Sequence, residues 1–288
     1  MTEHLIILAG GASSRMKKSE DSSLSKDVAG QANTRSKALI TLNNRPMLDY
    51  VLYNAREGGI KNVIIVISPN DALFKELYGD KDAYNSFNGL SISYAVQHIP
   101  EGREKPFGTA DAVFQALEQY PEMQEQEFLV CNCDNLYSPQ AFELLRKASA
   151  KNALINYDRD ALDFSMERIS RFALTRTHKN GYLTGIVEKP QSDEIEKFKD
   201  TEGKFRVSMN IFKFDGNLFY DYLKNCPVNV QRNEKELPTA LLNMVADYPK
   251  SVKTIPLSEH VPDLTSKSDI KQMNAYLSNH FTSEDWTR

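Results

Sequence analysis

A glycine-rich turn near the start of the chain has the composition of a ligand site. An apolar run at residues 5–9 leads into residues 10–16, GGASSRM. Small residues let the backbone approach a phosphate chain closely, their N–H groups can point at its oxygens, and Arg15 would neutralise its charge. The spacing matches neither of the common nucleotide motifs, G-x-G-x-x-G and G-x-x-x-x-G-K-[ST]. Taken alone, the turn predicts either a phosphate site of another kind or a tight turn after a strand.

Asp134 is an acidic side chain that follows a predicted strand. It closely follows the apolar run at residues 128–131. If that run is a central strand, the carboxylate lies at its carboxyl end, where open α/β sheets bind ligands. Mg²⁺ takes one or two carboxylates together with phosphate oxygens and water. The alternative role, capping the next helix, suits Asn135 or Ser138 better.

Other chemistries have weaker support. Cys131 and Cys133 form a C-x-C pair without nearby histidines, which is a poor zinc site, and the five histidines are scattered along the chain. No Ser/His/Asp arrangement can be argued, so a covalent serine hydrolase is not expected. The odd total of three cysteines fits a reducing compartment, and the expected location is the cytoplasm.

Composition and charge define the class of protein. The chain has 288 residues, of which 41% are apolar and 26% charged, as in an ordinary globular domain. A net charge of −4 offers no general attraction to nucleic acid or to an anionic membrane, so neither is an expected partner. The apolar run near the N-terminus is too short for a signal peptide or a membrane span. A phosphate ligand must therefore be held by local groups.

The elements that position these residues alternate between strand and helix in the first half. Short apolar runs predict strands, and apolar spacing of three and four predicts the helices between them. The predicted strands are 4–9, 62–68, 91–97, 127–133 and 153–157, and the predicted helices are 47–57, 72–78, 109–119 and 139–150. This alternation is typical of a doubly wound parallel sheet.

The second half departs from this pattern. Runs at 171–177 and 182–188 are joined by HKNG, and Asn-Gly between alternating runs predicts a hairpin. Further strands are predicted at 205–214 and 252–257, with helices at 218–224, 238–246 and 267–277. The expected fold class is thus α/β: a doubly wound, mostly parallel mixed sheet flanked by helices, with an antiparallel hairpin excursion in the second half.

Residues 17–33 fit neither pattern. The segment is rich in Ser, Lys, Asp, Gly and Asn, and a segment with few apolar groups cannot bury enough surface to order itself. We therefore predict a mobile loop, which is either a lid that closes over a ligand or an insertion without a role.

Several stretches, in order along the chain, resemble the nucleotidyltransferase superfamily that activates sugar 1-phosphates. They are LAGGASSRM at 8–16, SKALI at 36–40 leading to NRPML at 44–48, Gln97, GTADA at 108–112, DNLY at 134–137, VEKP at 187–190 and SMNIF at 208–212. The resemblance covers the chain from Leu5 to about Tyr276. It implies one domain over 1–288, with a nucleotide-binding part at about 1–150, a sugar-binding part at about 151–265 and a C-terminal helix at about 267–280.

The resemblance also implies a reaction and its partners. In such enzymes, a phosphate oxygen of a sugar 1-phosphate attacks the α-phosphorus of a nucleoside triphosphate, and pyrophosphate leaves. The expected partners are therefore a nucleoside triphosphate and a sugar 1-phosphate, and the expected cofactor is Mg²⁺. Positioning and charge neutralisation do most of the catalytic work in phosphoryl-group chemistry of this kind.

Site residues follow by matching this sequence to the family's motifs. Catalytic roles fall to Arg15, Lys37 and Lys189. Nucleotide contacts fall to Leu8, Ala9, Gly10, Gly11, Gln97, Gly108 and Thr109, with Gln97 facing the base and Gly108 making room for it. Sugar contacts fall to Glu188, Lys189 and Asn156, and metal ligands to Asp134 and Asp263. Asp269 lies close to Asp263 and is the alternative for the second carboxylate.

Departures from the family pattern leave the substrates open. Ser13 stands where many members have glycine, and the Ser-Ser pair resembles the molybdenum-cofactor guanylyltransferases of the same superfamily. Asn210 also replaces a glycine, and Asn is the next most tolerant residue of positive φ. The alternatives are transfer to a cofactor or a phosphorylated alcohol, or a non-catalytic member that senses nucleotide. The base and the oligomeric state also stay open, a homo-oligomer included.

Overall fold

A computed structural model describes residues 1–79, 85, 87–187 and 195–286. Seven strands form the main path of its large sheet, in the order β11-β7-β10-β6-β1-β4-β5. They are β1 (His4–Leu8), β4 (Asn62–Ile67), β5 (Ser91–Val96), β6 (Glu127–Asn132), β7 (Asn152–Asp158), β10 (Arg206–Asp215) and β11 (Val252–Leu257). Along this path β10 runs antiparallel to both of its neighbours, while the other adjacent pairs are parallel. The predicted fold class is confirmed.

The predicted hairpin is also present. Strands β8 (Leu174–Thr177) and β9 (Leu183–Val187) pair antiparallel, and β8 joins the large sheet through β10. Gly181 closes the turn with φ +73°, a backbone conformation that glycine adopts without strain. A separate small sheet pairs β2 (Thr41–Leu42) with β3 (Arg45–Pro46).

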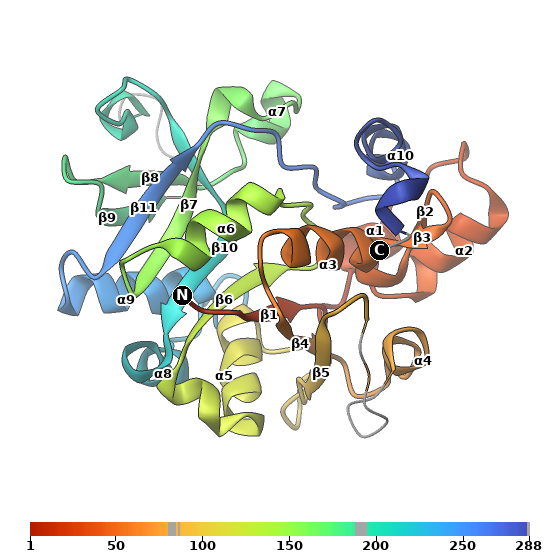
Figure 1. The fold of residues 1–288 in the computed structure, drawn as a ribbon, viewed down its shortest axis with the longest axis horizontal. Helices are drawn as coiled ribbons and strands as arrows, with labels where there is room; N and C mark the ends of the chain where they lie inside the picture. The colour runs from red at the N-terminus through yellow and green to blue at the C-terminus, as the bar shows by residue number, and fades with distance from the viewer. Residues whose placement is uncertain (80–84, 86, 188–194, 287–288) are drawn as a thin grey trace.

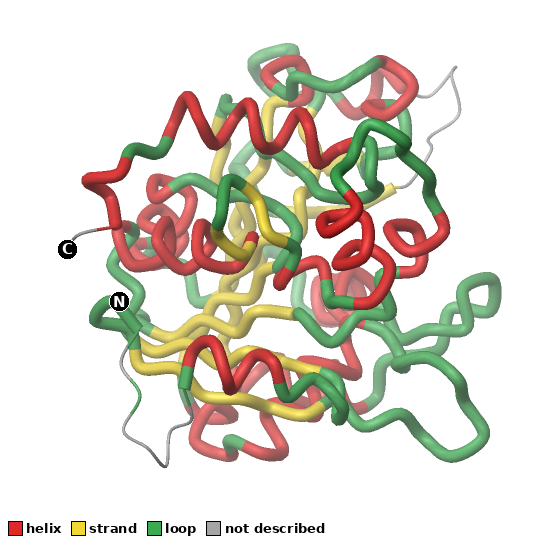
Figure 2. Tube along the Cα trace, turned by 90° about the vertical axis from the view of Figure 1, so that its right-hand side faces the viewer, coloured by secondary structure: helices red, strands yellow, loops and turns green. Residues whose placement is uncertain are grey.

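Helices cover both faces of the sheet (Figures 1 and 2). Because side chains alternate along a strand, Leu5 and Ile7 enter one core while Ile6 enters the other. The first core includes α3 (Met47–Glu57), α6 (Pro139–Lys147) and α10 (Asp269–His280). The second includes α5 (Thr109–Gln119), α8 (Gly216–Lys224) and α9 (Leu237–Asp247). Among the described helices, none combines the length and the apolar character that crossing a membrane requires.

Short helices complete the described chain. The α-helical ones are α1 (Ser14–Lys18), α2 (Lys26–Thr34), α4 (Leu73–Tyr78) and α7 (Met166–Ile169). The 3₁₀ helices are η1 (Lys37–Leu39), η3 (Pro121–Glu125), η4 (Arg159–Ala161), η5 (Ile195–Phe198) and η6 (Ser283–Trp286).

The prediction that residues 17–33 lack regular structure is wrong, because α2 occupies much of this segment. The Ser25 side chain caps α2 by accepting a hydrogen bond from the Val28 N–H. Gln31 is buried, donates to Asp27 and accepts from the Thr41 N–H. Ala32 is fully buried in the core. Capping and one buried amide therefore order a segment that is poor in large apolar side chains.

Candidate active site

The glycine-rich turn joins β1 to α1 and lines a cavity of about 470 Å³. Ser13, which precedes α1, has φ +53°, a backbone conformation that glycine adopts more readily than residues with a Cβ. The cavity brings together all the predicted nucleotide-binding residues with two predicted catalytic ones. They are Leu8, Ala9, Gly10, Gly11, Gln97, Gly108 and Thr109, with Arg15 and Lys37.

Gln97 presents one side of its amide to this cavity. Its Nε2 donates to the backbone oxygen of Gly108 at 3.0 Å and to Oδ2 of Asp111 at 2.8 Å. These two bonds fix the orientation of the amide, so the carbonyl oxygen Oε1 is the group left for a ligand. A Cβ on Gly10 would lie 3.5 Å from that oxygen.

The backbone conformation and the close packing at position 108 both require glycine. Its φ is +102°, and a Cβ there would lie 2.4 Å from the backbone oxygen of Lys235. The loop that carries Lys235 therefore packs directly on the turn before α5. The structure thus accounts for this glycine by conformation and close approach, whereas the sequence interpretation gave it the role of making room for a base.

Lys37 lies in η1 and is largely buried. Its Nζ lies 2.7 Å from Oδ2 of Asp134, which follows the end of β6 by two residues. Burial alone would lower the pKa of Lys37, but the attraction of Asp134 and the hydrogen bond to it outweigh burial and raise that pKa. The hydroxyl of Ser36, the residue before Lys37, donates to the backbone oxygen of Ala9 at 3.0 Å. Lys37 is therefore a fixed positive charge beside the glycine-rich turn.

Asp134 and Asp263 come together although they lie far apart in the sequence. Asn135 and Asp263 form an antiparallel bridge, and the Leu264 N–H donates to the backbone oxygen of Asp134 at 2.8 Å. Burial and the repulsion of Asp134 raise the pKa of the Asp263 carboxyl. The fold therefore places the two predicted metal ligands side by side.

Each of these carboxylates has one oxygen engaged. Oδ2 of Asp134 accepts from Lys37, whereas Oδ2 of Asp263 accepts from Arg168 Nη2 at 2.7 Å and from Thr265 Oγ1 at 2.8 Å. Within the described residues, Oδ1 of either aspartate accepts no hydrogen bond. Two free carboxylate oxygens suit Mg²⁺, which would draw its remaining ligands from phosphate and water. The described part of the chain holds no cluster of three or more His, Cys, Asp or Glu side chains that would form a closed metal site.

Asp269, the alternative second ligand, has both of its oxygens engaged. Oδ1 accepts from Arg168 Nη1 at 2.5 Å. Oδ2 accepts from the Thr265 N–H, the Ser266 N–H and the Ser266 hydroxyl. Asp263 rather than Asp269 therefore has an oxygen available for a cation.

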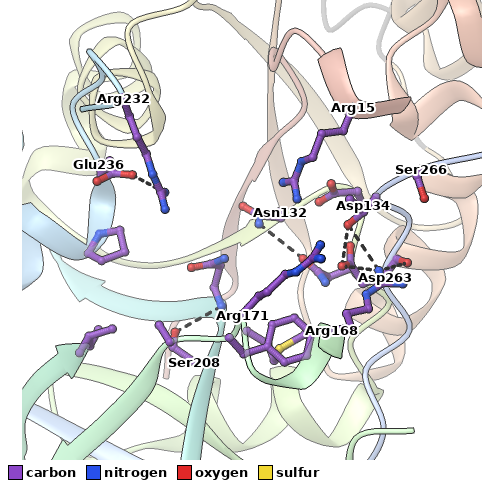
Figure 3. A pocket seen from close by; sticks show the side chains of 18 of the residues that line it. Arg15, Asn132, Asp134, Arg168, Arg171, Ser208, Arg232, Glu236, Asp263 and Ser266 are labelled. Carbon is purple, nitrogen blue, oxygen red and sulfur yellow. Dashed lines mark hydrogen bonds and ion pairs between the residues drawn. The ribbon is translucent and has the colours of Figure 1, made fainter. Parts of the chain in front are cut away.

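A second, larger cavity of about 760 Å³ adjoins the first. The two cavities share three lining residues: Arg15, Asn132 and Asp134. The side chain of Arg15 points into the larger cavity (Figure 3) and makes no hydrogen bond or ion pair within the described residues. The wall includes Asn210 of β10, whose φ of +59° confirms the positive φ expected at this position.

Three further arginines line the larger cavity, and sequence reasoning missed them. Arg168 pairs with Asp263 and Asp269. Arg171 pairs with Glu167, and Arg232 pairs with Glu236 at 2.6 Å. The last two pairs have i,i+4 spacing, which in a sequence indicates only a solvated pair. Their place at a cavity follows from the fold alone.

Of the three predicted sugar contacts, only Asn156 lies within the described residues. Asn156 is buried in β7, accepts from the Thr175 hydroxyl at 2.5 Å and lines neither cavity. Glu188 and Lys189 lie outside the described residues, immediately after β9. Their assignment as acceptor contacts stays a prediction.

A glycine-rich turn, a buried lysine and two adjacent aspartates thus meet at one edge of a doubly wound sheet, where folds of this class bind ligands. Comparison with known families assigns the chain more closely. It belongs to the nucleotidyl transferase family, which matches residues 4–277.

Individual relatives are distant. A glucose-1-phosphate thymidylyltransferase of Neisseria meningitidis is 28% identical over 188 residues, which is 65% of this chain and 55% of that protein. A bifunctional protein GlmU of Staphylococcus epidermidis is 24% identical over 255 residues, which is 87% of this chain and 47% of that protein. The chain thus spans about half the length of the curated relatives it matches.

Proposed function

We propose that this chain transfers a nucleoside monophosphate from a nucleoside triphosphate to a sugar 1-phosphate and releases pyrophosphate. One observation carries the proposal: the cavity lined by the glycine-rich turn meets the larger cavity at Arg15 and Asp134. A triphosphate in the first cavity would present its α-phosphate where an acceptor in the second could reach it. Such proximity is the main requirement of phosphoryl-group transfer.

Two basic residues would each stabilise a different part of the negative charge on the reacting phosphates. An acceptor phosphate oxygen forms a new bond to the α-phosphorus, and the bond from that phosphorus to the bridging oxygen of the pyrophosphate breaks. Arg15, unpaired in the described chain, would bind the triphosphate oxygens. Lys37 would stabilise the charge that grows on the α-phosphate and the leaving group. Mg²⁺, held by Asp134 and Asp263, would supply further neutralisation of the triphosphate.

Several observations favour a sugar phosphate as the acceptor. One relative is named for glucose 1-phosphate, and the resemblance assigns the sequence EKP at 188–190, which follows β9 in the chain, to the sugar and its phosphate. The wall of the larger cavity also carries Arg171 and Arg232, which can donate to an acceptor phosphate, although Glu167 and Glu236 pair with them and balance their charge. On the nucleotide side, the fixed amide of Gln97 would select a base that directs an N–H donor at Oε1.

A pyrophosphate-release screen tests the proposal. The four common nucleoside triphosphates and dTTP are crossed with a panel of sugar 1-phosphates and phosphorylated alcohols, with Asp134→Asn as the inactive control. We expect release with at least one sugar 1-phosphate. Release with phosphorylated alcohols only would instead favour the guanylyltransferase-like alternative. Triphosphate binding without release for any acceptor would favour a nucleotide sensor.

A further inference from the structure

Arg168 occupies a position that the sequence motifs do not account for. It belongs to α7, whose N-cap Ser165 accepts from the Arg168 N–H. Its side chain is only 21% exposed, and its guanidinium lies 4.4 Å from the centre of the Phe164 ring. Figure 3 shows it beside Asp263, at the wall of the larger cavity.

The guanidinium binds two carboxylates with different groups. Nη2 contacts Oδ2 and the backbone oxygen of Asp263, while Nη1 contacts Oδ1 of Asp269. Asp269 is itself held by three donors from Thr265 and Ser266. A planar fork with several donors can satisfy such a set of acceptors, and a lysine ammonium cannot match its geometry. Arg168 is therefore held on one side by a fixed anchor and directed at Asp263 on the other.

The contacts of Asp263 fall on one oxygen. Arg168 and the Thr265 hydroxyl both donate to Oδ2, so rotation of the carboxylate would break two hydrogen bonds at once. Asp134 likewise has one oxygen engaged, because Lys37 donates a hydrogen bond to its Oδ2. Each of the two adjacent aspartates thus has a basic side chain on one oxygen, which offsets their mutual repulsion and leaves the other oxygen available.

We propose that Arg168 is a positioning residue for the metal site: anchored by Asp269, it holds Oδ2 of Asp263 and so keeps Oδ1 available to a divalent cation. This inference rests on the proposed function. Groups that orient metal ligands in this way typically contribute 10- to 100-fold to metal affinity. Arg168 has two alternative roles that experiment can distinguish from positioning. It could bind the acceptor phosphate, or it could occupy the site as a cation that must leave before the metal enters.

Cation binding is the direct test. Mn²⁺ is titrated into the full chain by electron paramagnetic resonance, with an α,β-methylene nucleoside triphosphate present and no acceptor. We expect Arg168→Gln to weaken Mn²⁺ binding by about 10- to 100-fold, and Arg168→Lys to recover only part of that loss. Thr265→Val, which removes the second donor to Oδ2, should give a smaller loss.

Arg159→Gln is the matched control. Arg159 is 19% exposed, lies 4.1 Å from the centre of the Phe205 ring and lines neither cavity. Its variant should bind Mn²⁺ as the unmodified chain does. Circular dichroism and thermal unfolding of all variants identify any loss that comes from misfolding.

The possible outcomes distinguish a failure of the positioning role of Arg168 from a failure of the proposed nucleotidyl transfer. Unchanged Mn²⁺ affinity in a folded Arg168→Gln variant, with a raised KM for the acceptor alone, would overturn the positioning role in favour of phosphate binding. Tighter Mn²⁺ binding would overturn it in favour of a blocking cation. An unmodified chain that fails to bind Mn²⁺ with any triphosphate would contradict the proposed function itself.

Discussion

Lys37 Nζ and Asp134 Oδ2 lie 2.7 Å apart although 97 residues separate them in the chain. The lysine comes from η1, beyond the glycine-rich turn, and the aspartate from the end of β6. The contact joins the cavity lined by the glycine-rich turn to the pair formed by Asp134 and Asp263. It also fixes which oxygen of Asp134 is left for a cation. Changes at either residue should therefore affect turnover before they affect the fold.

Asp134→Asn should lower turnover by at least about 100-fold while leaving the chain folded. The amide keeps a hydrogen-bond acceptor for Lys37 but loses the negative charge that a divalent cation needs. Steady-state pyrophosphate release measures turnover, and circular dichroism checks the fold. Chelation by EDTA should abolish activity in the unmodified chain, and full activity in EDTA would rule out the metal role.

Lys37→Met and Lys189→Ala should differ in the kinetic constant they change. Lys37 acts on charge that develops in the transition state, so its loss should depress kcat by about 100-fold or more. Lys189, in the acceptor motif, should chiefly raise the KM for the sugar phosphate when lost. Full saturation curves for both substrates distinguish the two cases. Identical kinetic profiles for the two variants would contradict this division of roles.

The strands could be predicted from sequence because their signals are local, whereas the residues that line the smaller cavity were assigned by their resemblance to family motifs. The apolar run at 5–9 predicts a strand. The turn that follows this strand lines the smaller cavity. Arg168 could not be predicted, because only the packing of α7 against the 263–269 segment gives it two carboxylate partners. Helix α2 was missed for a similar reason: Gln31 gains its partner at Thr41 only in the folded chain.

Asp111→Asn should weaken discrimination among nucleoside triphosphates by up to about 10-fold, the value of one hydrogen bond. Asp111 accepts from Nε2 of Gln97 at 2.8 Å and thereby fixes which side of the amide faces the cavity. An asparagine can donate as well as accept, so Gln97 could present either side. The measurement is kcat/KM for each triphosphate. Gln119→Ala, which removes contacts to Val96 outside the cavity, is the control, and unaltered preferences in Asp111→Asn would refute the orienting role.

Asn210→Ala should destabilise the chain by about 1 kcal/mol, whereas Asn210→Gly should be close to neutral. The residue has φ +59°, which costs a residue with a Cβ about 1–2 kcal/mol unless its side chain compensates, as asparagine partly does. Urea unfolding of the three proteins measures the difference. Equal stability of the alanine and glycine variants would show that this backbone conformation changes when the side chain does.

Lys267→Met should loosen the short helix that carries Arg15. The buried Lys267 ammonium donates to the backbone oxygens of Lys17 and Ser19, and its backbone N–H donates to the Ser19 hydroxyl. Figure 1 accordingly shows α1 and α10 on the same side of the molecule. Without the ammonium, two carbonyl groups at the end of α1 lose their partner, which costs about 1–3 kcal/mol of stability. Arg15 then becomes less well placed for a triphosphate.

We expect faster hydrogen exchange across residues 14–19 in Lys267→Met and a several-fold higher KM for the triphosphate. Adding triphosphate and Mg²⁺ should restore part of the protection, because Arg15 then gains a partner. Lys271→Met is the control, since that lysine lies exposed on α10, which begins two residues after Lys267. If exchange across 14–19 is the same in both variants and in the unmodified chain, the contact from Lys267 does not hold α1, and Arg15 owes its position to the glycine-rich turn alone.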